Sequence, residues 1–252
     1  MGQHTPVALV VGASGITGSA VLRQLVGAGV DAHGLARSPG ELPAGATPIA
    51  ADLLDAAGLR AALEGLRPTH VYYTSWARRP TETENCEVNA RMMRNLFDAL
   101  EGAGGVEHVA LVTGLKHYLG PFDAYGQGAV PDTPFLETEE RLPGENFYYA
   151  QEDELFAAAA RLGFRWSVHR SHTVIGFALG NAMNMALTLG AQAAICRELG
   201  RPMVFPGSEV QWNGVTDLTD ADHLARHMVW AATTPEAADQ AFNVVNGDVF
   251  RW

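Results

Sequence analysis

Glycines near the N-terminus have the spacing of a loop that holds phosphate groups. The apolar run Val7–Val11 leads directly into Gly12-Ala-Ser-Gly-Ile-Thr-Gly18, which opens a segment with helical spacing. The first glycine permits a tight strand-to-helix turn, the second lets the backbone approach a pyrophosphate, and the third lets helix and strand pack closely. Free N–H groups at the helix start add a positive dipole end. A plain glycine turn is the alternative, but its place after the first strand favours a dinucleotide site. The expected contacts are Gly12, Ser14, Gly15, Ile16, Thr17 and Gly18.

The end of the second predicted strand indicates which dinucleotide binds. Sites for NAD place an acidic residue there, whereas the run here is Gly34-Leu-Ala-Arg-Ser38, without a carboxylate. Arg37 could pair with the 2′-phosphate of NADPH, and Ser38 could donate a hydrogen bond to it, so we expect NADPH. Arg37 as a solvated loop arginine is the alternative.

Further cofactor contacts are expected after the later strands. Asp52, next to Leu53, could accept from the adenine amino group, although a helix N-cap or first-turn acid is nearly as good an interpretation. Thr74 and Ser75 end the fourth strand and could line the ribose side. Thr113 ends the fifth strand, beside the expected nicotinamide position.

The reactive groups do not follow the usual spacing. Short-chain dehydrogenases carry Tyr-x-x-x-Lys on one helix, but the positions four residues after Tyr148 and Tyr149 hold Glu152 and Asp153. The only lysine of the chain, Lys116, follows the fifth predicted strand, where open α/β sheets bind ligands. Either this chain lacks the tyrosine–lysine chemistry of short-chain dehydrogenases, or its lysine and tyrosine come from different segments.

Several longer stretches carry a family resemblance. The most distinctive are Lys116-His-Tyr-Leu-Gly-Pro-Phe122 and Asn146-Phe-Tyr-Tyr149, and matches at Thr74–Ala77, Glu84–Asn89 and Ala241–Phe250 extend it over nearly the whole chain. The chain resembles the progesterone 5β-reductase/iridoid synthase-like enone reductases, an atypical branch of the short-chain dehydrogenase/reductase superfamily. The resemblance implies that Lys116 and Tyr148, the first tyrosine of its pair, form the catalytic couple.

The chemistry of conjugate reduction fits such a couple. Hydride addition to the β-carbon of an enone develops negative charge on the carbonyl oxygen, and a phenol aimed at that oxygen stabilises the enolate. A nearby ammonium orients the phenol and adds positive potential. The alternatives are that Lys116 is a surface charge, that Tyr148 is a core aromatic residue, or that Tyr149 is the reactive tyrosine.

The chain departs from this family at two places. After Arg170 the family has a proline and a small polar run, whereas Ser171-His-Thr-Val174 stands here. The resemblance implies that this segment, with Val174, contacts the nicotinamide amide through its backbone. The family also continues beyond the position of Trp252, so we expect a partial chain or a shortened homologue with a less covered substrate pocket.

The order of elements predicts the fold. Strand-like and helix-like runs alternate, which is typical of a parallel sheet with helices on both faces. We expect an α/β fold with a Rossmann-type doubly wound parallel sheet, forming a single NAD(P)-binding domain over residues 1–252 with a missing or shortened C-terminal part. Residues 171–215 are expected to form part of a small substrate-binding lobe. The predicted strands are Pro6–Val11, Val30–Ala36, Thr47–Ala50, His70–Thr74, Glu107–Thr113, Phe164–Arg170 and Ala241–Val245. The predicted helices are Ile16–Ala28, Leu54–Leu66, Glu84–Leu100, Tyr148–Leu162, Ala182–Leu199 and Asp220–Thr233.

Composition restricts the partners. The 252 residues are 47% hydrophobic with a net charge of −11, which argues against nucleic acid and anionic membrane as partners. The two cysteines form no CxxC pattern, and no signal peptide or membrane span is read, so a cytoplasmic protein is expected. Asp217, Asp220 and Asp222 lack a suitably spaced histidine, and Asp220 fits a helix N-cap better, so no metal is expected.

The function classes follow from these residues. The leading hypothesis is an NADPH-dependent oxidoreductase that reduces the C=C bond of a small apolar α,β-unsaturated carbonyl compound, with Tyr148 stabilising the enolate oxygen. A carbonyl reductase or epimerase-like short-chain enzyme using the same tyrosine is the second hypothesis. A non-catalytic NADP-binding protein is the third, and a homodimer is considered for each of them.

Overall fold

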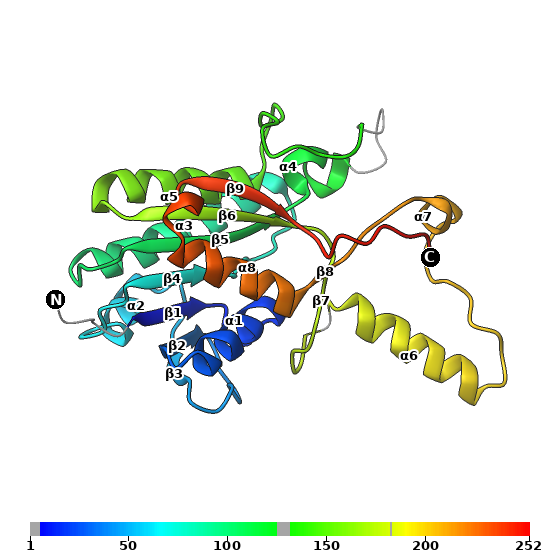
Figure 1. Cartoon of the computed structure of the whole chain (residues 1–252), viewed down its shortest axis with the longest axis horizontal. Helices are drawn as coiled ribbons and strands as arrows, with labels where there is room; N and C mark the ends of the chain where they lie inside the picture. Colours follow the sequence, from blue (N-terminus) through cyan, green and yellow to red (C-terminus); the bar gives the residue numbers. More distant parts are fainter. Residues whose placement is uncertain (1–5, 125–131, 182) are drawn as a thin grey trace.

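A single parallel sheet forms the centre of the molecule. The structure, a computed structural model, describes residues 6–124, 132–181 and 183–252. Its main sheet has the strand order β3-β2-β1-β4-β5-β6-β9, and every neighbouring pair is parallel (Figure 1). This order confirms the predicted Rossmann-type sheet. The strands are β1 (Val7–Val11), β2 (Asp31–Ala36), β3 (Thr47–Ala50), β4 (His70–Tyr73), β5 (His108–Gly114), β6 (Arg165–Ser171) and β9 (Gln240–Val244).

Helices cover both faces of the sheet. On one face α2 (Ala56–Ala62), α3 (Glu82–Glu101) and α5 (Phe147–Leu162) share an apolar cluster with the strands. On the other face α1 (Ile16–Gly27) and α8 (Ala221–Thr233) share a second cluster. Leu9 of β1 faces the first cluster and Val10 the second, which is why this strand is a continuous apolar run.

The two helices nearest the site have well-defined starts. Thr81 caps α3, since its hydroxyl accepts from the Glu84 N–H while the Glu84 carboxylate accepts from the Thr81 N–H. Asn146 caps α5, and its side chain accepts from the Tyr148 N–H. Tyr148 therefore lies in the first turn of its helix, with its backbone held by the cap.

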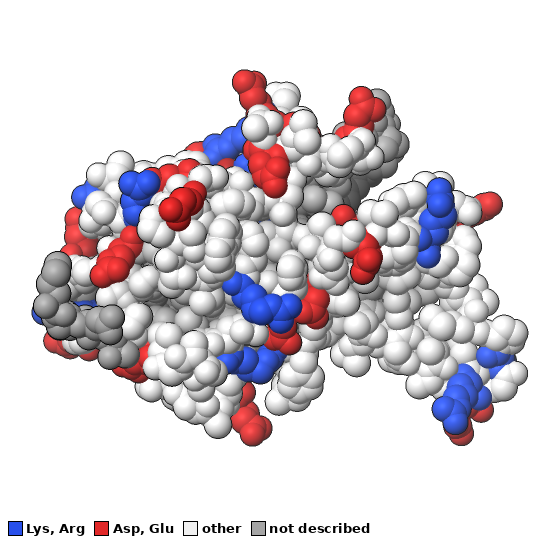
Figure 2. All heavy atoms as spheres, viewed as in Figure 1, with Lys and Arg blue, Asp and Glu red and all other residues white. Residues whose placement is uncertain are grey.

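A lobe stands apart from the sheet. It contains α6 (Met185–Glu198) and α7 (Glu209–Asn213), and neither helix has a buried residue among those described (Figure 1). The short strands β7 (Val174–Ile175) and β8 (Thr219–Asp220) pair where the lobe joins the sheet domain. Much of the lobe's surface is uncharged on the face seen in Figure 2. The helices fall within the segment predicted as a lobe, and its role in substrate binding stays a prediction.

Some elements differ from the sequence predictions. The helix predicted over Leu54–Leu66 is shorter, because the Asp55 side chain caps it by accepting from the Gly58 N–H. Between β5 and α5, where no element was predicted, the chain forms α4 (Lys116–Leu119) and the 3-10 turn η1 (Phe122–Ala124). The predicted N-cap at Asp220 is confirmed, since its carboxylate accepts from the His223 N–H. The remaining elements are α7, β7, β8 and the 3-10 turn η2 (Pro235–Ala237), which are too short to give a periodic signal.

The packing of α5 on the sheet predicts a stability effect. Leu155 is fully buried in the first cluster, so Leu155→Ala removes apolar contacts and leaves a cavity. We expect the free energy of unfolding to fall by about 2–5 kcal/mol, measured by urea denaturation. The matched control is Leu187→Ala, because Leu187 is 58% exposed on α6, and its effect should stay within about 0.5 kcal/mol. Equal effects of the two substitutions would contradict this packing.

Candidate active site

A cavity of about 900 Å³ opens at the carboxyl ends of β1, β2 and β4. It is at the edge of the sheet where open α/β folds bind their ligands. Residues predicted to contact a dinucleotide contribute much of its wall: Gly12, Ser14, Gly15, Arg37, Ser38, Asp52, Leu53, Thr74 and Ser75. The structure thus brings together residues from four separate segments of the chain.

The glycine loop fits closely against its surroundings. Gly12 has a φ of +89°, a conformation that favours glycine, and a Cβ there would come 2.8 Å from the Thr74 Oγ1 atom. A Cβ on Gly18 would come 2.2 Å from the Gly12 carbonyl oxygen. The third glycine is therefore required for the helix to approach the strand, as the sequence pattern predicts.

The start of α1 suits an anionic group. Gly15 is its N-cap and provides no capping side chain, so the N–H groups of the first turn have no side-chain acceptor in the described part of the chain. Ile16, Thr17 and Gly18 are outside the cavity wall, and the Ile16 side chain is buried in the core. Ile16 and Gly18 can reach a diphosphate only through backbone N–H groups, which is the contact that a helix N-terminus offers, whereas the half-buried Thr17 also has a hydroxyl.

The part of the cavity after β2 and β3 has a positive and a negative side chain. Arg37 and Ser38 are exposed at the cavity, and within the described residues the Arg37 guanidinium makes no hydrogen bond or ion pair. Asp52 is not a helix N-cap, since its carboxylate accepts from the Leu54 N–H while Asp55 caps α2. The Leu53 carbonyl accepts from the Asn95 side chain at 2.7 Å, which fixes this part of the wall on α3.

The loop after β4 extends the cavity wall beyond Thr74 and Ser75. Trp76, a candidate for the ribose side together with them, lines the cavity. The sequence analysis missed Ala77, Arg78 and Arg79 of this loop, and Asn181 from the segment before α6. Two asparagines of α3 hold this loop: Asn85 accepts from the Arg79 N–H at 2.6 Å, and Asn89 accepts from the Ala77 N–H at 2.8 Å. The adjacent arginines in a loop that follows a strand were a usable signal for an anion site.

Lys116 is buried at the carboxyl end of β5. It begins α4, and its side chain is 3% exposed, so the alternative that Lys116 is a surface charge is excluded. Its ammonium pairs with the Glu82 carboxylate, with distances of 3.0 and 3.1 Å from Nζ to the two oxygens. Burial lowers the pKa of Lys116, and the hydrogen bond and charge of Glu82 raise it.

Tyr148 lies close to the same strand end. A Cβ built on Gly114 would come 3.3 Å from the Tyr148 hydroxyl oxygen, so the phenol lies against the last residue of β5, two positions before Lys116. The ring of Phe147 lies between the cavity and the lysine: it stacks on Trp76 with centroids 5.2 Å apart, and Lys116 Nζ is 4.3 Å from its centroid. Lysine, tyrosine and cavity wall are therefore joined by aromatic contacts.

Tyr149 has a structural position. Its hydroxyl donates to the His117 carbonyl at 2.6 Å and accepts from the Leu142 N–H at 3.0 Å. Burial raises the pKa of Tyr149. These contacts turn the second tyrosine of the pair toward α4 and away from the end of β5 at Gly114.

Two further predicted cofactor residues are outside the cavity wall. Thr113 is buried, and its carbonyl accepts from the Ser171 hydroxyl at 3.1 Å. Val174 is in β7, where it pairs with Thr219, and Thr219 also accepts from the His172 N–H. The segment after β6 then runs beside α1, since the Ser19 hydroxyl donates to the Phe177 carbonyl. A contact of Thr113 or Val174 with the nicotinamide stays a prediction.

Similar proteins agree with the fold and the motifs. Residues 8–245 match the NAD dependent epimerase/dehydratase family. A (S)-8-oxocitronellyl enol synthase of Nepeta cataria is 40% identical over 263 residues, which cover 99% of this chain and 67% of that protein. A 3-oxo-Delta(4,5)-steroid 5-beta-reductase of Arabidopsis thaliana is 40% identical over 257 residues, covering 98% of this chain and 66% of that protein. The chain thus spans about two thirds of the length of these relatives.

The fold also resembles a solved structure. The Thermus thermophilus UDP-glucose 4-epimerase in complex with NAD superposes with a TM-score of 0.74 at 22% identity, over 97% of this chain and 79% of that one. Fold and glycine loop together define a nucleotide-binding protein of the Rossmann class. The chain belongs to the NAD-dependent epimerase/dehydratase family, and the resemblance to the 5β-reductase and iridoid synthase group is confirmed.

The family match supports a nicotinamide dinucleotide as the cofactor. Within the described residues, no helix combines the length and the apolar character needed to cross a membrane. A homodimer, a cytoplasmic location and the division into domain and lobe stay predictions.

The close contact at Gly18 predicts weaker cofactor binding on substitution. Gly18→Ala forces the helix away from the Gly12 carbonyl, so the dissociation constant for NADPH or NADH should rise about tenfold or more, measured by fluorescence titration. Gly27→Ala is the matched control, because a Cβ at that position in the same helix meets nothing within 4 Å. Unchanged binding in Gly18→Ala would contradict the fit of the loop.

Proposed function

We propose that this chain reduces the C=C bond of an α,β-unsaturated carbonyl compound with NADPH. The observation that carries the proposal is the placement of a buried lysine ammonium and the Tyr148 phenol at the same end of β5, next to the dinucleotide cavity. NADPH would be held by the glycine loop and α1, with Arg37 and Ser38 at its 2′-phosphate. It supplies the hydride that adds to the β-carbon of the enone.

Tyr148 acts on the oxygen of the substrate. As the β-carbon gains a hydride, the electron pair of the C=C bond moves to the α-carbon and the carbonyl oxygen, giving an enolate. The Tyr148 hydroxyl donates to that oxygen and stabilises the charge as it forms. Protonation then completes the saturated carbonyl product, with one hydride and one proton added overall.

Lys116 supports the phenol electrostatically. A buried ammonium near the phenol favours the more negative state that develops when the phenol gives its proton toward the enolate. Phe147 and Trp76 exclude water on the cavity side of the lysine, which strengthens this interaction. Tyr149 is unsuited to the task because its hydroxyl is held by α4 and the Leu142 N–H.

The relatives support the reaction class. One is named a reductase of a 3-oxo-Delta(4,5)-steroid, in which the reduced bond is conjugated to a ketone. The other is named an enol synthase, and an enol is the oxygen-protonated form of an enolate. Both names fit a site that stabilises charge on a carbonyl oxygen. The family match also supports the second hypothesis, carbonyl reduction or epimerisation with the same tyrosine.

Removal of the Tyr148 hydroxyl tests the proposal. Tyr148→Phe should lower kcat for NADPH oxidation with a small cyclic or linear enone by about a hundredfold or more, because it removes the donor to the enolate oxygen. Cofactor binding should be unchanged. The saturated ketone is the expected product, identified by gas chromatography, and an alcohol product would favour carbonyl reduction instead.

Tyr149→Phe is the matched control for this substitution. It removes one hydroxyl from the neighbouring residue and leaves Tyr148 in place. We expect kcat within about threefold of wild type and a loss of stability of about 1 kcal/mol, from the two hydrogen bonds. If kcat fell sharply in Tyr149→Phe and not in Tyr148→Phe, Tyr149 would be the reactive tyrosine and the proposal would be wrong. Tight NADPH binding without turnover in any form would favour a non-catalytic binding protein.

The choice of NADPH over NADH is tested at Arg37. Arg37→Ala removes the guanidinium expected at the 2′-phosphate, and a charged hydrogen bond of this kind contributes about 1.5–3 kcal/mol. The dissociation constant for NADPH should rise about tenfold to a hundredfold, whereas that for NADH should stay nearly constant. Arg60→Ala, on the last turn of α2, is the control. Equal weakening for both cofactors would refute a role in 2′-phosphate recognition.

A further inference from the structure

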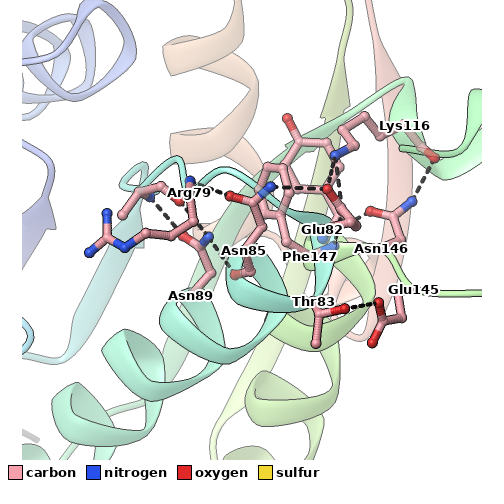
Figure 3. Close-up of polar contacts among 11 residues, drawn as sticks. Arg79, Glu82, Thr83, Asn85, Asn89, Lys116, Glu145, Asn146 and Phe147 are labelled. Atoms are coloured by element: carbon pink, nitrogen blue, oxygen red, sulfur yellow. Dashed lines mark hydrogen bonds and ion pairs between the residues drawn. The ribbon is translucent and has the colours of Figure 1, made fainter. Parts of the chain in front are cut away.

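The Glu82 carboxylate joins three elements at the edge of the sheet. It lies in the first turn of α3, and it accepts hydrogen bonds from Lys116, Phe147 and Asn85 (Figure 3). We propose that Glu82 is the positioning residue of the site: it holds the Lys116 ammonium and the start of α5 in the arrangement that Tyr148 requires. This inference rests on the proposed function and adds to it a residue that the lysine–tyrosine couple does not include.

The contacts of Glu82 use both carboxylate oxygens. Oε1 accepts from Lys116 Nζ at 3.0 Å and from the Phe147 N–H at 2.8 Å. Oε2 accepts from Lys116 Nζ at 3.1 Å and from the Asn85 side-chain amide at 3.1 Å. A carboxylate with this many donors on separate elements has little freedom to rotate. The bond from Asn85, itself only 5% exposed, fixes the orientation of the carboxylate from within α3.

A second set of bonds ties the lysine to the helix of Tyr148. The Asn146 amide donates to the Lys116 carbonyl at 2.7 Å, and its side-chain oxygen accepts from the Tyr148 N–H at 3.0 Å (Figure 3). Glu82 binds the same helix at the residue after Asn146, where its carboxylate accepts from the Phe147 N–H. Lys116 is thus linked to α5 through its backbone by Asn146 and through its ammonium by Glu82.

The electrostatics of the lysine depend on the same carboxylate. The charged and titratable groups that act on Lys116 include Glu82 and Cys86 from α3 and Asp123 from η1, and the Tyr148 phenol of α5 lies at the same strand end. Glu82 alone among these forms an ion pair with Lys116. Phe147 packs against the ammonium and excludes water there. Without Glu82 the buried charge would lose its direct partner, and the neutral amine would be favoured.

Glu82→Gln tests the proposal because it keeps the shape and removes the charge. An amide oxygen can still accept from the Phe147 N–H, so the start of α5 retains an acceptor. We expect kcat at neutral pH to fall about tenfold or more. The alkaline limb of the kcat profile should move about one unit or more to lower pH, because Lys116 then loses its proton more easily. Glu82→Asp, which restores the charge, should recover part of kcat and of the profile.

The single lysine of the chain permits a readout independent of turnover. In protein labelled with ¹³C-lysine, the ε-carbon signal can come only from Lys116, and its chemical shift reports the protonation state. Glu82→Gln should lower the pKa of Lys116 relative to wild type in this titration. Glu145→Gln is the matched control: Glu145 is also acidic and close by, but it is exposed and accepts from the Thr83 hydroxyl instead (Figure 3). Its Lys116 titration and kcat profile should match wild type.

The outcomes separate this inference from the proposed function. A folded Glu82→Gln protein in which either kcat or the Lys116 titration is unchanged overturns the positioning role. A loss of kcat that Glu82→Asp does not relieve, with no shift of the pH profile, also overturns it, since that pattern indicates a structural effect. If wild type reduces no enone while the Lys116 pKa still depends on Glu82, the proposed reaction fails and the coupling between the two residues stands.

Discussion

A lysine ammonium that is only 3% exposed needs a counter-charge to remain charged inside a protein. Glu82 provides it, and because the two residues belong to different elements, the ion pair also fixes where those elements meet. The first turn of α3, the end of β5 and the start of α5 are joined at this one carboxylate. The rest of the site depends on that junction, since Tyr148 follows Phe147 directly.

The helix α3 connects the reactive end with the nucleotide end. Its first turn carries Glu82, its next two turns carry Asn85 and Asn89, which hold the backbone of the loop after β4, and Asn95 binds the Leu53 carbonyl. One helix therefore shapes the wall of the dinucleotide cavity and positions the lysine. Buried polar side chains without hydrogen-bond partners would destabilise the fold, and each of these three asparagines has a partner.

The sheet and its helices could be predicted because their signals are local. Strands buried on both faces give continuous apolar runs, and the Gly12–Gly18 spacing follows from close packing that a Cβ would prevent. Contacts between distant segments gave no such signal. The sequence could not show that the Ile16 side chain turns into the core, or that Asn181 reaches the cavity from a distant segment. Glu82 is indistinguishable in sequence from an ordinary acidic residue in a helix's first turn.

The separation of lysine and tyrosine has a physical reason in α5. A residue four positions after Tyr148 occupies the same face of the helix in a regular pattern, and here that residue is Glu152. Its carboxylate is 3% exposed and pairs with Arg141 at 2.8 Å, so a lysine at this position would bury a second cation beside the guanidinium. The ammonium has to come from another element, and Lys116 follows two positions after Gly114, which lies beside the Tyr148 hydroxyl. The start of α5 holds the backbone of Lys116 through Asn146, and a separate carboxylate, Glu82, fixes the ammonium.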